Sequence, residues 1–309
     1  MSPQQPIALI GAPTDAGANV PGTGLGPDAL RIAGIVQALR ARGLQVIDQG
    51  NLNGPCVDHH TPHALHNGCR HLAEVTRWNQ AVFGAVSGAL TAGHLPVLLG
   101  GDHSLAIGSI SAVAQHCKRQ GKRLHVLWLD AHADANTPDT SASGNLHGMP
   151  VACLLGHGLP GLTHLGSSTA LEPSQLSLLG VRSVDAAEKH LVSALGLAVY
   201  DMRSIDEVGM RSAMEQALHG LDPTTHLHVS LDLDCIDPTV APGVGTPVHG
   251  GPTYREIQLC MEMLADCAAL GSVDVMELNP TLDIRNQTAE LAVDLLESLF
   301  GKTTLMRLR

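Results

Sequence analysis

The sequence Val126-Leu127-Trp128-Leu129-Asp130-Ala131-His132-Ala133-Asp134 joins an apolar run to three side chains that can bind a metal ion. A short apolar run of this kind is typical of a buried β-strand. Alternate residues of an extended chain point to the same side. The side chains of Asp130, His132 and Asp134, spaced two residues apart just past the strand, can therefore converge on one point. We interpret the stretch as a strand that ends in a metal site.

A long polar loop follows this cluster and ends at Pro150. The loop consists mainly of small polar residues, contains neither Lys nor Arg, and includes His147, which is framed by Asn145 and Gly148. This is the composition of a loop that contacts a polar substrate beside a metal site. We therefore expect the segment 135–150 to hold the substrate.

Short apolar runs alternate with amphipathic segments along the whole chain. We expect strands at 7–10, 44–47, 95–99, 124–129, 175–181, 197–200, 227–231 and 272–276. Helices are expected between them, including 27–43, 71–92, 186–194, 205–218, 253–269 and 287–300. This alternation predicts an α/β fold with a mostly parallel sheet covered on both faces. No linker or repeat divides the chain, so we expect one catalytic domain over residues 1–309.

The composition excludes several classes of partner. The net charge is −11 and only 2% of the residues are aromatic, which argues against a nucleic-acid or anionic-membrane partner. No apolar stretch approaches the ~20 residues of a membrane span, and the N-terminus lacks a signal-peptide pattern. The seven cysteines include no C-x-x-C pair, as expected for reduced thiols in a cytoplasmic protein. A negative chain is compatible with a cationic small-molecule substrate.

Other strand ends carry similar groups. In a parallel sheet, functional sites form at the carboxyl ends of strands. Asp102 and His103 follow the strand 95–99, and Asp232 and Asp234 repeat the two-residue spacing after 227–231. The last strand offers Asp274 and Glu277. A single acid after a strand is usually a loop or cap residue, but three strand ends with matching groups favour one shared site.

Six side chains form the predicted ligand set. They are His103, Asp130, His132, Asp134, Asp232 and Asp234. Six ligands are too many for one tetrahedral zinc ion and suit two divalent ions with bridging carboxylates. Imidazole together with hard oxygen ligands favours Mn²⁺, although the affinity order alone does not exclude Co, Ni or Zn.

Three motifs resemble those of the ureohydrolase superfamily, which includes arginases and agmatinases. They lie at Gly100–Ser104, Asp130–Asp134 and Ser230–Pro238. Within the superfamily, the loop segments Asn136–Pro138 and Ser143–Pro150 resemble the arginase branch. The resemblance implies a three-layer α/β/α fold with an eight-stranded sheet. It also implies a homotrimer or a homohexamer.

The resemblance assigns roles to individual residues. Two Mn²⁺ per chain would be held by the six side chains named above, with Asp130 and Asp232 bridging. His147 would be the catalytic acid or base, and Glu277 would pair with the guanidinium group. Further substrate contacts are implied for Asn136, Ser143, Asn145, Asp185, Glu188 and Thr246, with Asn136 and Ser143 at the α-carboxylate and Asp185 and Glu188 near the α-amino group. Ser183 stands where the family usually has an aspartate.

The implied activity is hydrolysis of L-arginine to L-ornithine and urea, a reaction of arginine metabolism and the urea cycle. Since a guanidinium is already a cation, the metals would act on water rather than on the substrate. A hydroxide that bridges them would attack the guanidinium carbon, with Asp134 holding its proton. Glu277 would fix the substrate, and His147 would supply the proton that the leaving amine needs.

Other interpretations remain open at this point. The protein could be another amidinohydrolase, acting on agmatine or a guanidino acid, a zinc-dependent amide deacetylase, or an inactive binding protein. Residue by residue, His147 could be a core or capping histidine, and Glu277 a buried acid paired with Arg285. Asp185 and Glu188 could simply be charges at the start of a helix.

Overall fold

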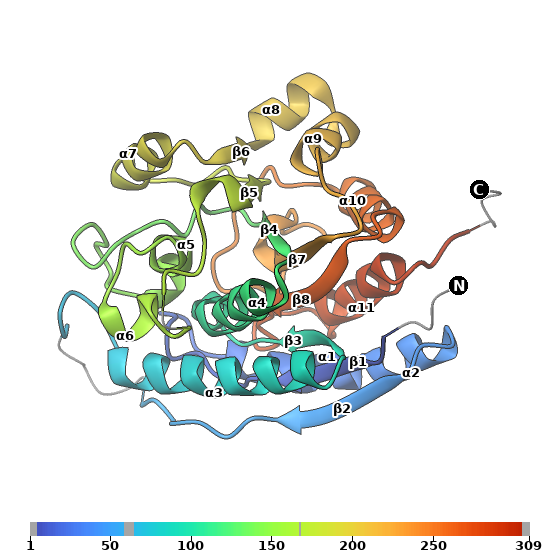
Figure 1. The fold of residues 1–309 in the computed structure, drawn as a ribbon, viewed down its shortest axis with the longest axis horizontal. Coiled ribbons are helices and arrows are strands. Elements are labelled where there is room, and N and C mark those ends of the chain that lie inside the picture. Colours follow the sequence, from blue (N-terminus) through green and yellow to red (C-terminus); the bar gives the residue numbers. More distant parts are fainter. Residues whose placement is uncertain (1–4, 59–64, 167, 305–309) are drawn as a thin grey trace.

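A computed structural model describes residues 5–58, 65–166 and 168–304, and its centre is an eight-stranded parallel sheet (Figure 1). The strand order is β2-β1-β3-β8-β7-β4-β5-β6, and every neighbouring pair is parallel. The strands are β1 (Ile7–Gly11), β2 (Val46–Asn51), β3 (Leu95–Leu99), β4 (Arg123–Leu129), β5 (Leu176–Leu179), β6 (Ala198–Tyr200), β7 (Thr225–Asp232) and β8 (Leu270–Met276). The prediction of a parallel, eight-stranded α/β fold is therefore confirmed.

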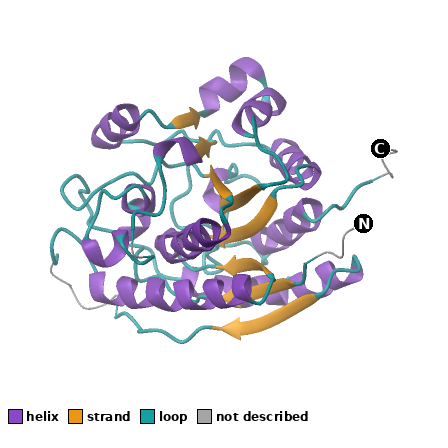
Figure 2. Ribbon diagram, in the orientation of Figure 1, coloured by secondary structure: helices purple, strands orange, loops and turns teal. Residues whose placement is uncertain are grey.

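Helices lie on both sides of the sheet (Figure 2). The α-helices are α1 (Gly26–Ile32), α2 (Ile35–Ala41), α3 (Leu72–Thr91), α4 (Ala106–Gln120), α5 (Pro150–Leu154), α6 (Pro160–Thr163), α7 (Ala186–Leu195), α8 (Met202–Val208), α9 (Met210–Ala217), α10 (Tyr254–Asp266) and α11 (Gln287–Leu299). Short 3₁₀ helices are η1 (Thr23–Leu25), η2 (His103–Leu105), η3 (Leu146–Gly148), η4 (Pro173–Gln175) and η5 (Leu233–Cys235). No helix of the described ranges is long and apolar enough to cross a bilayer.

The two faces of the sheet belong to two apolar cores. Along β4, Leu127 and Leu129 pack with the helices α1, α2, α9, α10 and α11, whereas Val126 and Trp128 pack with α3, α4 and α5. Alternate residues of a strand point to opposite faces, so a strand between two cores is apolar throughout. This explains why the strands could be recognised as continuous apolar runs.

Two helix predictions were wrong in the same way. The expected helix 27–43 is broken into α1 and α2 at Gly34, and the expected helix 205–218 is broken into α8 and α9 at Gly209. Both glycines have positive φ, 87° and 81°, which a continuing helix does not permit. The second strand begins later than expected, at Val46 rather than Leu44. The sequence also predicts a solvated polar loop over residues 51–69, and its His59, His60 and His63 lie outside the described residues.

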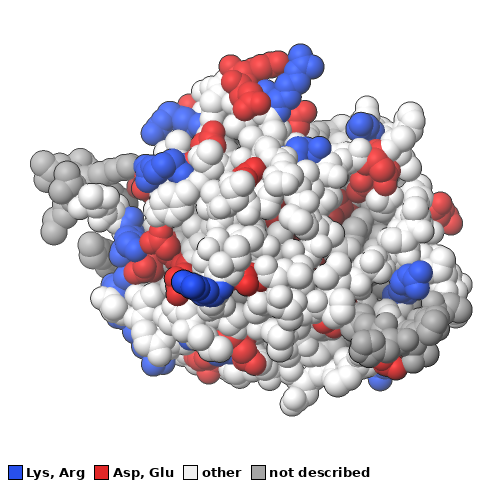
Figure 3. Space-filling model, turned by 180° about the vertical axis from the view of Figure 1, so that it is seen from behind, with Lys and Arg blue, Asp and Glu red and all other residues white. Residues whose placement is uncertain are grey.

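Charged side chains of both signs are interspersed over the face shown in Figure 3, and uncharged residues cover most of it. This agrees with the sequence, in which only 15% of the residues are charged.

A row of polar side chains interrupts the core between β7, β8 and α4. His226 and His228 of β7 both bond to the hydroxyl of Ser272 on β8, at 2.9 and 2.8 Å. His228 also contacts Asp274, whose other oxygen accepts a hydrogen bond from Ser109 of α4 at 2.6 Å. Each group has a partner, as buried polar groups require. Asp274, a candidate from the sequence, thus belongs to this row inside the sheet.

His226 should make folding sensitive to acid. Burial, reinforced by His228 and His116, lowers the pKa of His226 to about 3. Its contribution to stability is present above the unfolded pKa of about 6.5 and is lost as the pH falls from there towards 3. We expect the free energy of unfolding to fall by about 2 kcal/mol from this group between pH 7.5 and 5, as measured by urea denaturation of the metal-free protein.

The variant His226→Gln should lose this part of the pH dependence, whatever its absolute stability. Exposed His190 provides the control, because His190→Gln should keep the parent slope. Equal slopes for His226→Gln and the parent protein would contradict the assignment.

Candidate metal centre and substrate pocket

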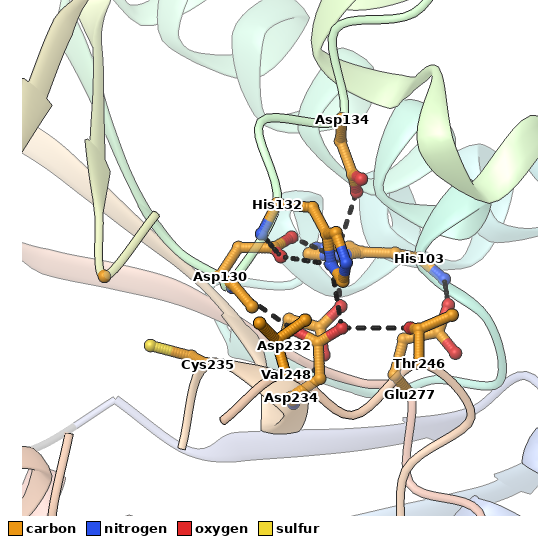
Figure 4. A network of polar contacts seen from close by, with 12 residues as sticks. His103, Asp130, His132, Asp134, Asp232, Asp234, Cys235, Thr246, Val248 and Glu277 are labelled. Carbon is orange, nitrogen blue, oxygen red and sulfur yellow. Dashed lines mark hydrogen bonds and ion pairs between the residues drawn. The ribbon is translucent and has the colours of Figure 1, made fainter. Parts of the chain in front are cut away.

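Three strand ends that are close together in the sheet supply the predicted ligands (Figure 4). His103 follows β3 in η2, Asp130 follows β4, and Asp232 ends β7. Because β8 alone separates β3 from β7, and β4 is the next strand on the other side of β7, these ends meet at one edge. Gly101 is required at the β3 end, since a Cβ atom there would lie 1.7 Å from the carbonyl oxygen of Thr14.

The first cluster surrounds the Nδ1 atom of His103. This nitrogen lies 3.1 Å from Oδ2 of Asp130, 3.5 Å from Oδ2 of Asp134 and 2.9 Å from Oδ2 of Asp232. His103 is buried, with 1% of its surface exposed. Three carboxylates from two strand ends therefore converge on one imidazole nitrogen.

The second cluster surrounds the Nδ1 atom of His132. This nitrogen lies 3.0 Å from Oδ2 of Asp234 and 3.5 Å from Oδ1 of Asp130. Asp130 thus directs one oxygen to each histidine. Asp232 has one oxygen at His103 and the other on the backbone N–H of Asp234.

The electrostatics of the two clusters show a shortage of positive charge. Burial, followed by the charge of neighbouring carboxylates, raises the pKa values of Asp134, Asp232 and Asp234. Burial opposes protonation of His103 and His132, but their carboxylate partners outweigh it and raise the two pKa values to about 9 and about 12. Protons on the imidazoles thus supply part of the charge that the carboxylates need.

Two divalent cations would meet that need. Two subsets, His103 with Asp130 and Asp134, and Asp130 with His132 and Asp234, each have ligand atoms within 4.8 Å of one another. Their donors are imidazole nitrogens and carboxylate oxygens, a set that suits Mn²⁺ and related ions. Metal ions would displace the imidazole protons, since ligands bind in the deprotonated form. The residues present therefore fit a binuclear centre.

Several side chains support the predicted ligands, and two of them, Trp128 and Ser230, were not predicted from the sequence. The indole Nε1 of Trp128 donates to Oδ2 of Asp130 at 2.9 Å, and the indole stacks on His103 with ring centroids 4.0 Å apart. Ser230 bonds to Nε2 of His103 at 2.9 Å. The hydroxyl of Thr246 donates to Oδ2 of Asp234 at 3.0 Å. Such contacts fix the orientation and charge of metal ligands. In the sequence, the only sign of these supporting side chains is that they lie close to the predicted ligands.

Glu277 and His147 form a pair beside the clusters. Oε1 of Glu277 accepts the backbone N–H of His103 at 2.8 Å and lies 3.1 Å from Nδ1 of His147. Burial opposes protonation of His147, but Glu277 outweighs it and raises the pKa of His147. The contacts of Glu277 are therefore with the site, rather than with Arg285 as the alternative supposed.

Asp102 holds the chain around this pair. It is fully buried and accepts the backbone N–H groups of Gly17 and Ser104, at 2.9 and 3.0 Å. The carbonyl of Gly17 in turn accepts the N–H of His147 at 3.0 Å. Asp102 therefore links the β3 end to the backbone of the histidine.

A pocket of about 240 Å³ opens above the clusters. Its lining includes most of the predicted site residues: His132, Asp134, Asn136, His147, Asp185, Glu188, Asp232, Asp234, Thr246 and Glu277. Ser183, which was not predicted, lines it too. His103 and Asp130 are fully buried beneath it. The substrate loop and the ligand strands therefore share one cavity.

Asp185 and Glu188 serve both α7 and the pocket. They form a capping box at the start of α7, so the interpretation as helix-start acids holds. Asp185 also accepts a hydrogen bond from the amide of Asn136 at 3.0 Å, and Glu188 accepts one from the N–H of Ala135 at 3.1 Å. The box thus fastens the substrate loop to α7.

Two predicted substrate contacts lie away from the pocket lining. Ser143 is exposed, and its hydroxyl accepts the N–H of Asn145 at 3.2 Å. Asn145 is 7% exposed, and its Oδ1 atom has no hydrogen-bond partner among the described residues. The structure does not bring these two residues to the cavity wall, so their role remains a prediction.

Two site residues have unusual backbone conformations. Asp134 and Glu277 have positive φ angles of 48° and 63°. Such conformations cost about 1–3 kcal/mol in a non-glycine residue and persist where the surroundings enforce them. At these positions they aim carboxylates into the pocket.

Comparisons with known proteins agree with the geometry. The model of the Arginase family matches residues 5–301. Arginase from Bacillus caldovelox is 44% identical over 301 residues, which cover 96% of this chain and 99% of the relative. The solved native structure of that enzyme superimposes with a TM-score of 0.91 at 41% identity, covering 98% of this chain and all of the other. Proclavaminate amidino hydrolase from Streptomyces clavuligerus gives a TM-score of 0.71 at 25% identity, covering 96% and 91%.

The variant Trp128→Phe tests the supporting contacts. Phenylalanine keeps the stack on His103 but cannot donate to Asp130. We expect metal affinity to fall by about 10–100-fold, as is usual when a ligand loses its hydrogen-bond partner. The measurement is competition with a fluorescent chelator. Affinity equal to that of the parent protein would show that the indole N–H has only a packing role.

Proposed function

The chain belongs to the arginase family and is an enzyme of that family, and from this premise we propose that it hydrolyses L-arginine to L-ornithine and urea. One observation carries the proposal: two His–Asp clusters share Asp130 and open into a pocket that also holds Glu277 and His147. A cationic guanidinium suits a cavity with so many carboxylates.

We propose two Mn²⁺ per chain as the cofactor, with His103, Asp130, Asp134 and Asp232 at one ion and Asp130, His132, Asp232 and Asp234 at the other. When bound, the two ions would supply the nucleophile, because a divalent cation lowers the pKa of water from about 15.7 towards 7. The imidazole and carboxylate donors of the two clusters support this assignment.

The protein groups have complementary tasks. Glu277 orients the guanidinium through charge-assisted hydrogen bonds and is itself held by the N–H of His103. Asp134, which lines the pocket, accepts a proton close to the guanidinium carbon whose C–N bond breaks. His147 donates a proton to the departing δ-amine, and the raised pKa of His147 keeps more of it protonated. His147 has 18% of its side chain exposed, so it can exchange protons with solvent.

Other residues that line the pocket suit the amino-acid end of the substrate. Asp185 and Glu188 would receive the α-amino group, and Thr246, which bonds to Asp234, would be a further contact. Asn136 would meet the α-carboxylate, together with Ser143 and Asn145 if the loop adjusts when substrate binds. Agmatine lacks the carboxylate and would leave these polar groups unpaired, which disfavours it.

The remaining proposals concern the domain organisation, the oligomeric state, the location and the metabolic role of the protein. We propose that residues 1–309 form one catalytic domain, because one sheet contains strands from both halves of the chain. A homotrimer or homohexamer in the cytoplasm, acting in arginine metabolism or the urea cycle, remains our expectation.

Two alternatives fit less well. Agmatinases and guanidino-acid hydrolases would use the same metal clusters, but the chain is 44% identical to an arginase and only 25% identical to the amidino hydrolase compared above. A deacetylase with one zinc would leave the second cluster, around His132, without a metal ion.

A substrate panel distinguishes the ureohydrolase activities. Urea release from L-arginine should exceed that from agmatine and 4-guanidinobutyrate by at least about 100-fold in kcat/KM, because unpaired polar groups penalise the shorter substrates. The variant Asn136→Ala should reduce the value for arginine and leave that for agmatine unchanged. Equal or faster turnover of agmatine by the parent enzyme would reject the arginase assignment.

The role of His147 is tested by His147→Asn. We expect kcat to fall by about 10²–10⁴-fold, the usual contribution of a general acid or base, with the metal content unchanged. The matched control is exposed His219, for which His219→Asn should keep full activity. Loss of metal from His147→Asn would instead assign His147 to the metal site.

Metal removal tests the cofactor. Dialysis against a chelator should abolish urea release, and Mn²⁺ should restore it more fully than Zn²⁺ when the metal content is matched. The measurement is elemental analysis and urea assay on the same samples. Full activity in metal-free protein would reject the metal mechanism, and better recovery with Zn²⁺ would reject manganese.

A further inference from the structure

A second cavity, of about 240 Å³, lies at the end of α4 away from the metal clusters. α4 begins directly after η2, which carries His103, and runs fifteen residues to Gln120. Ser111 and Lys118 of α4 line the cavity, together with Lys122, Ser168 and Thr169. None of these residues takes part in the proposed hydrolysis.

The cavity has positive charge without a compensating acid. Of the described residues that line it, none is Asp or Glu, whereas Lys118 and Lys122 both contribute. Neither lysine forms a salt bridge with any residue that the structure describes. Both lysine side chains are exposed, so their charge is available to a ligand in the cavity. They offer up to six N–H donors to a bound anion.

The hydroxyl of Ser111 is available as a further donor. Ser111 is only 4% exposed, yet it lines the cavity and forms no hydrogen bond within the described parts of the chain. Serine and threonine inside helices usually bond to the carbonyl four residues earlier, as Thr76 does to Leu72 in α3. The Oγ atom of Ser111 is not fully enclosed by protein, so it is accessible from the cavity and can donate a hydrogen bond to a ligand there.

The walls of the cavity are held in place by other side chains. The amide of Gln115 donates to the carbonyl of Gly166 at 3.2 Å, and that of Gln175 donates to the carbonyl of Leu124 at 3.3 Å. Gln115 thereby joins α4 to the segment before Ser168. These two hydrogen bonds connect the segments that line the cavity.

The C-terminal end of α4 accounts for only one of the two lysines at the cavity. Basic residues in a last turn offset the partial negative charge of the carbonyl groups there, which accounts for Lys118. Lys122 lies beyond Gly121, which ends the helix with φ of 64°, and still lines the cavity. Nor does the helix end account for the hydroxyl groups of Ser111, Ser168 and Thr169.

We propose that this cavity binds a small tetrahedral oxyanion, as free phosphate or as the phosphate group of a small metabolite. Two ammonium groups and three hydroxyl groups provide charge and donors for a dianion with several acceptor oxygens. One water occupies about 30 Å³ of the liquid, so 240 Å³ accommodates such an ion with a few waters. The lining has no aromatic side chain among its described residues on which a nucleobase could stack.

The test is equilibrium dialysis of radiolabelled inorganic phosphate against metal-loaded protein freed of excess metal, at constant ionic strength. We expect saturable binding of phosphate that persists after the metals are chelated. If a phosphate monoester is the natural ligand, glycerol 3-phosphate should displace the bound phosphate. Lys118→Met and Lys122→Met should each weaken binding about tenfold, and Ser111→Ala several-fold, as expected for lost charge-assisted hydrogen bonds.

Arg119 provides a matched control. It is exposed, basic and next to Lys118, but does not line the cavity, so Arg119→Met should change the affinity less than twofold. Because the cavity is separate from the substrate pocket, phosphate should leave KM for the guanidino substrate unchanged. Binding that vanishes on chelation, that competes with substrate, or that falls equally in Arg119→Met and Lys122→Met would overturn the proposal.

Discussion

Mutual repulsion among four buried carboxylates is the constraint on which the site depends. Asp130, Asp134, Asp232 and Asp234 are each at most 6% exposed and lie around only two imidazoles. Burying a charge is costly unless it is paired, and burial and repulsion raise the pKa values of three of these acids. Added cations would relieve this repulsion, which is why the arrangement indicates a metal centre more strongly than any single ligand does.

The order of the strands in the sheet brings these charged side chains together. Parallel strands end at the same edge, and the order β3-β8-β7-β4 places the ends that carry the predicted ligands together. The core beneath contacts these side chains: Trp128 stacks on His103 and bonds to Asp130, while Ser230 bonds to the other nitrogen of His103. Glu277, at the end of β8, connects the backbone of His103 to the side chain of His147. The sheet, the two His–Asp clusters and the pair of Glu277 and His147 are thus parts of one hydrogen-bonded system.

Much of the fold and part of the candidate site could be predicted from the sequence, because apolar periodicity and residue spacing are local properties. Apolar runs identified all eight strands, and the spacing of Asp130, His132 and Asp134 pointed to a stretch whose carboxylates and imidazole do cluster with side chains from other strand ends. Helix breaks at Gly34 and Gly209 were missed because apolar spacing continues across both glycines, although each adopts a positive φ. The supporting roles of Trp128, Ser230 and Asp102 depend on contacts across the sheet, which one sequence does not reveal. For the same reason, the sequence could not show that Ser143 and Asn145 lie away from the pocket lining.

The central claim is that two ions share Asp130 between the clusters of His103 and His132. Anomalous diffraction at the manganese edge, from crystals of the Mn²⁺-loaded protein, tests it most directly. The account predicts two anomalous peaks per chain, one bound by His103 and Asp134, the other by His132 and Asp234, with an oxygen of Asp130 on each. A single peak, or two peaks that do not share Asp130, would contradict it.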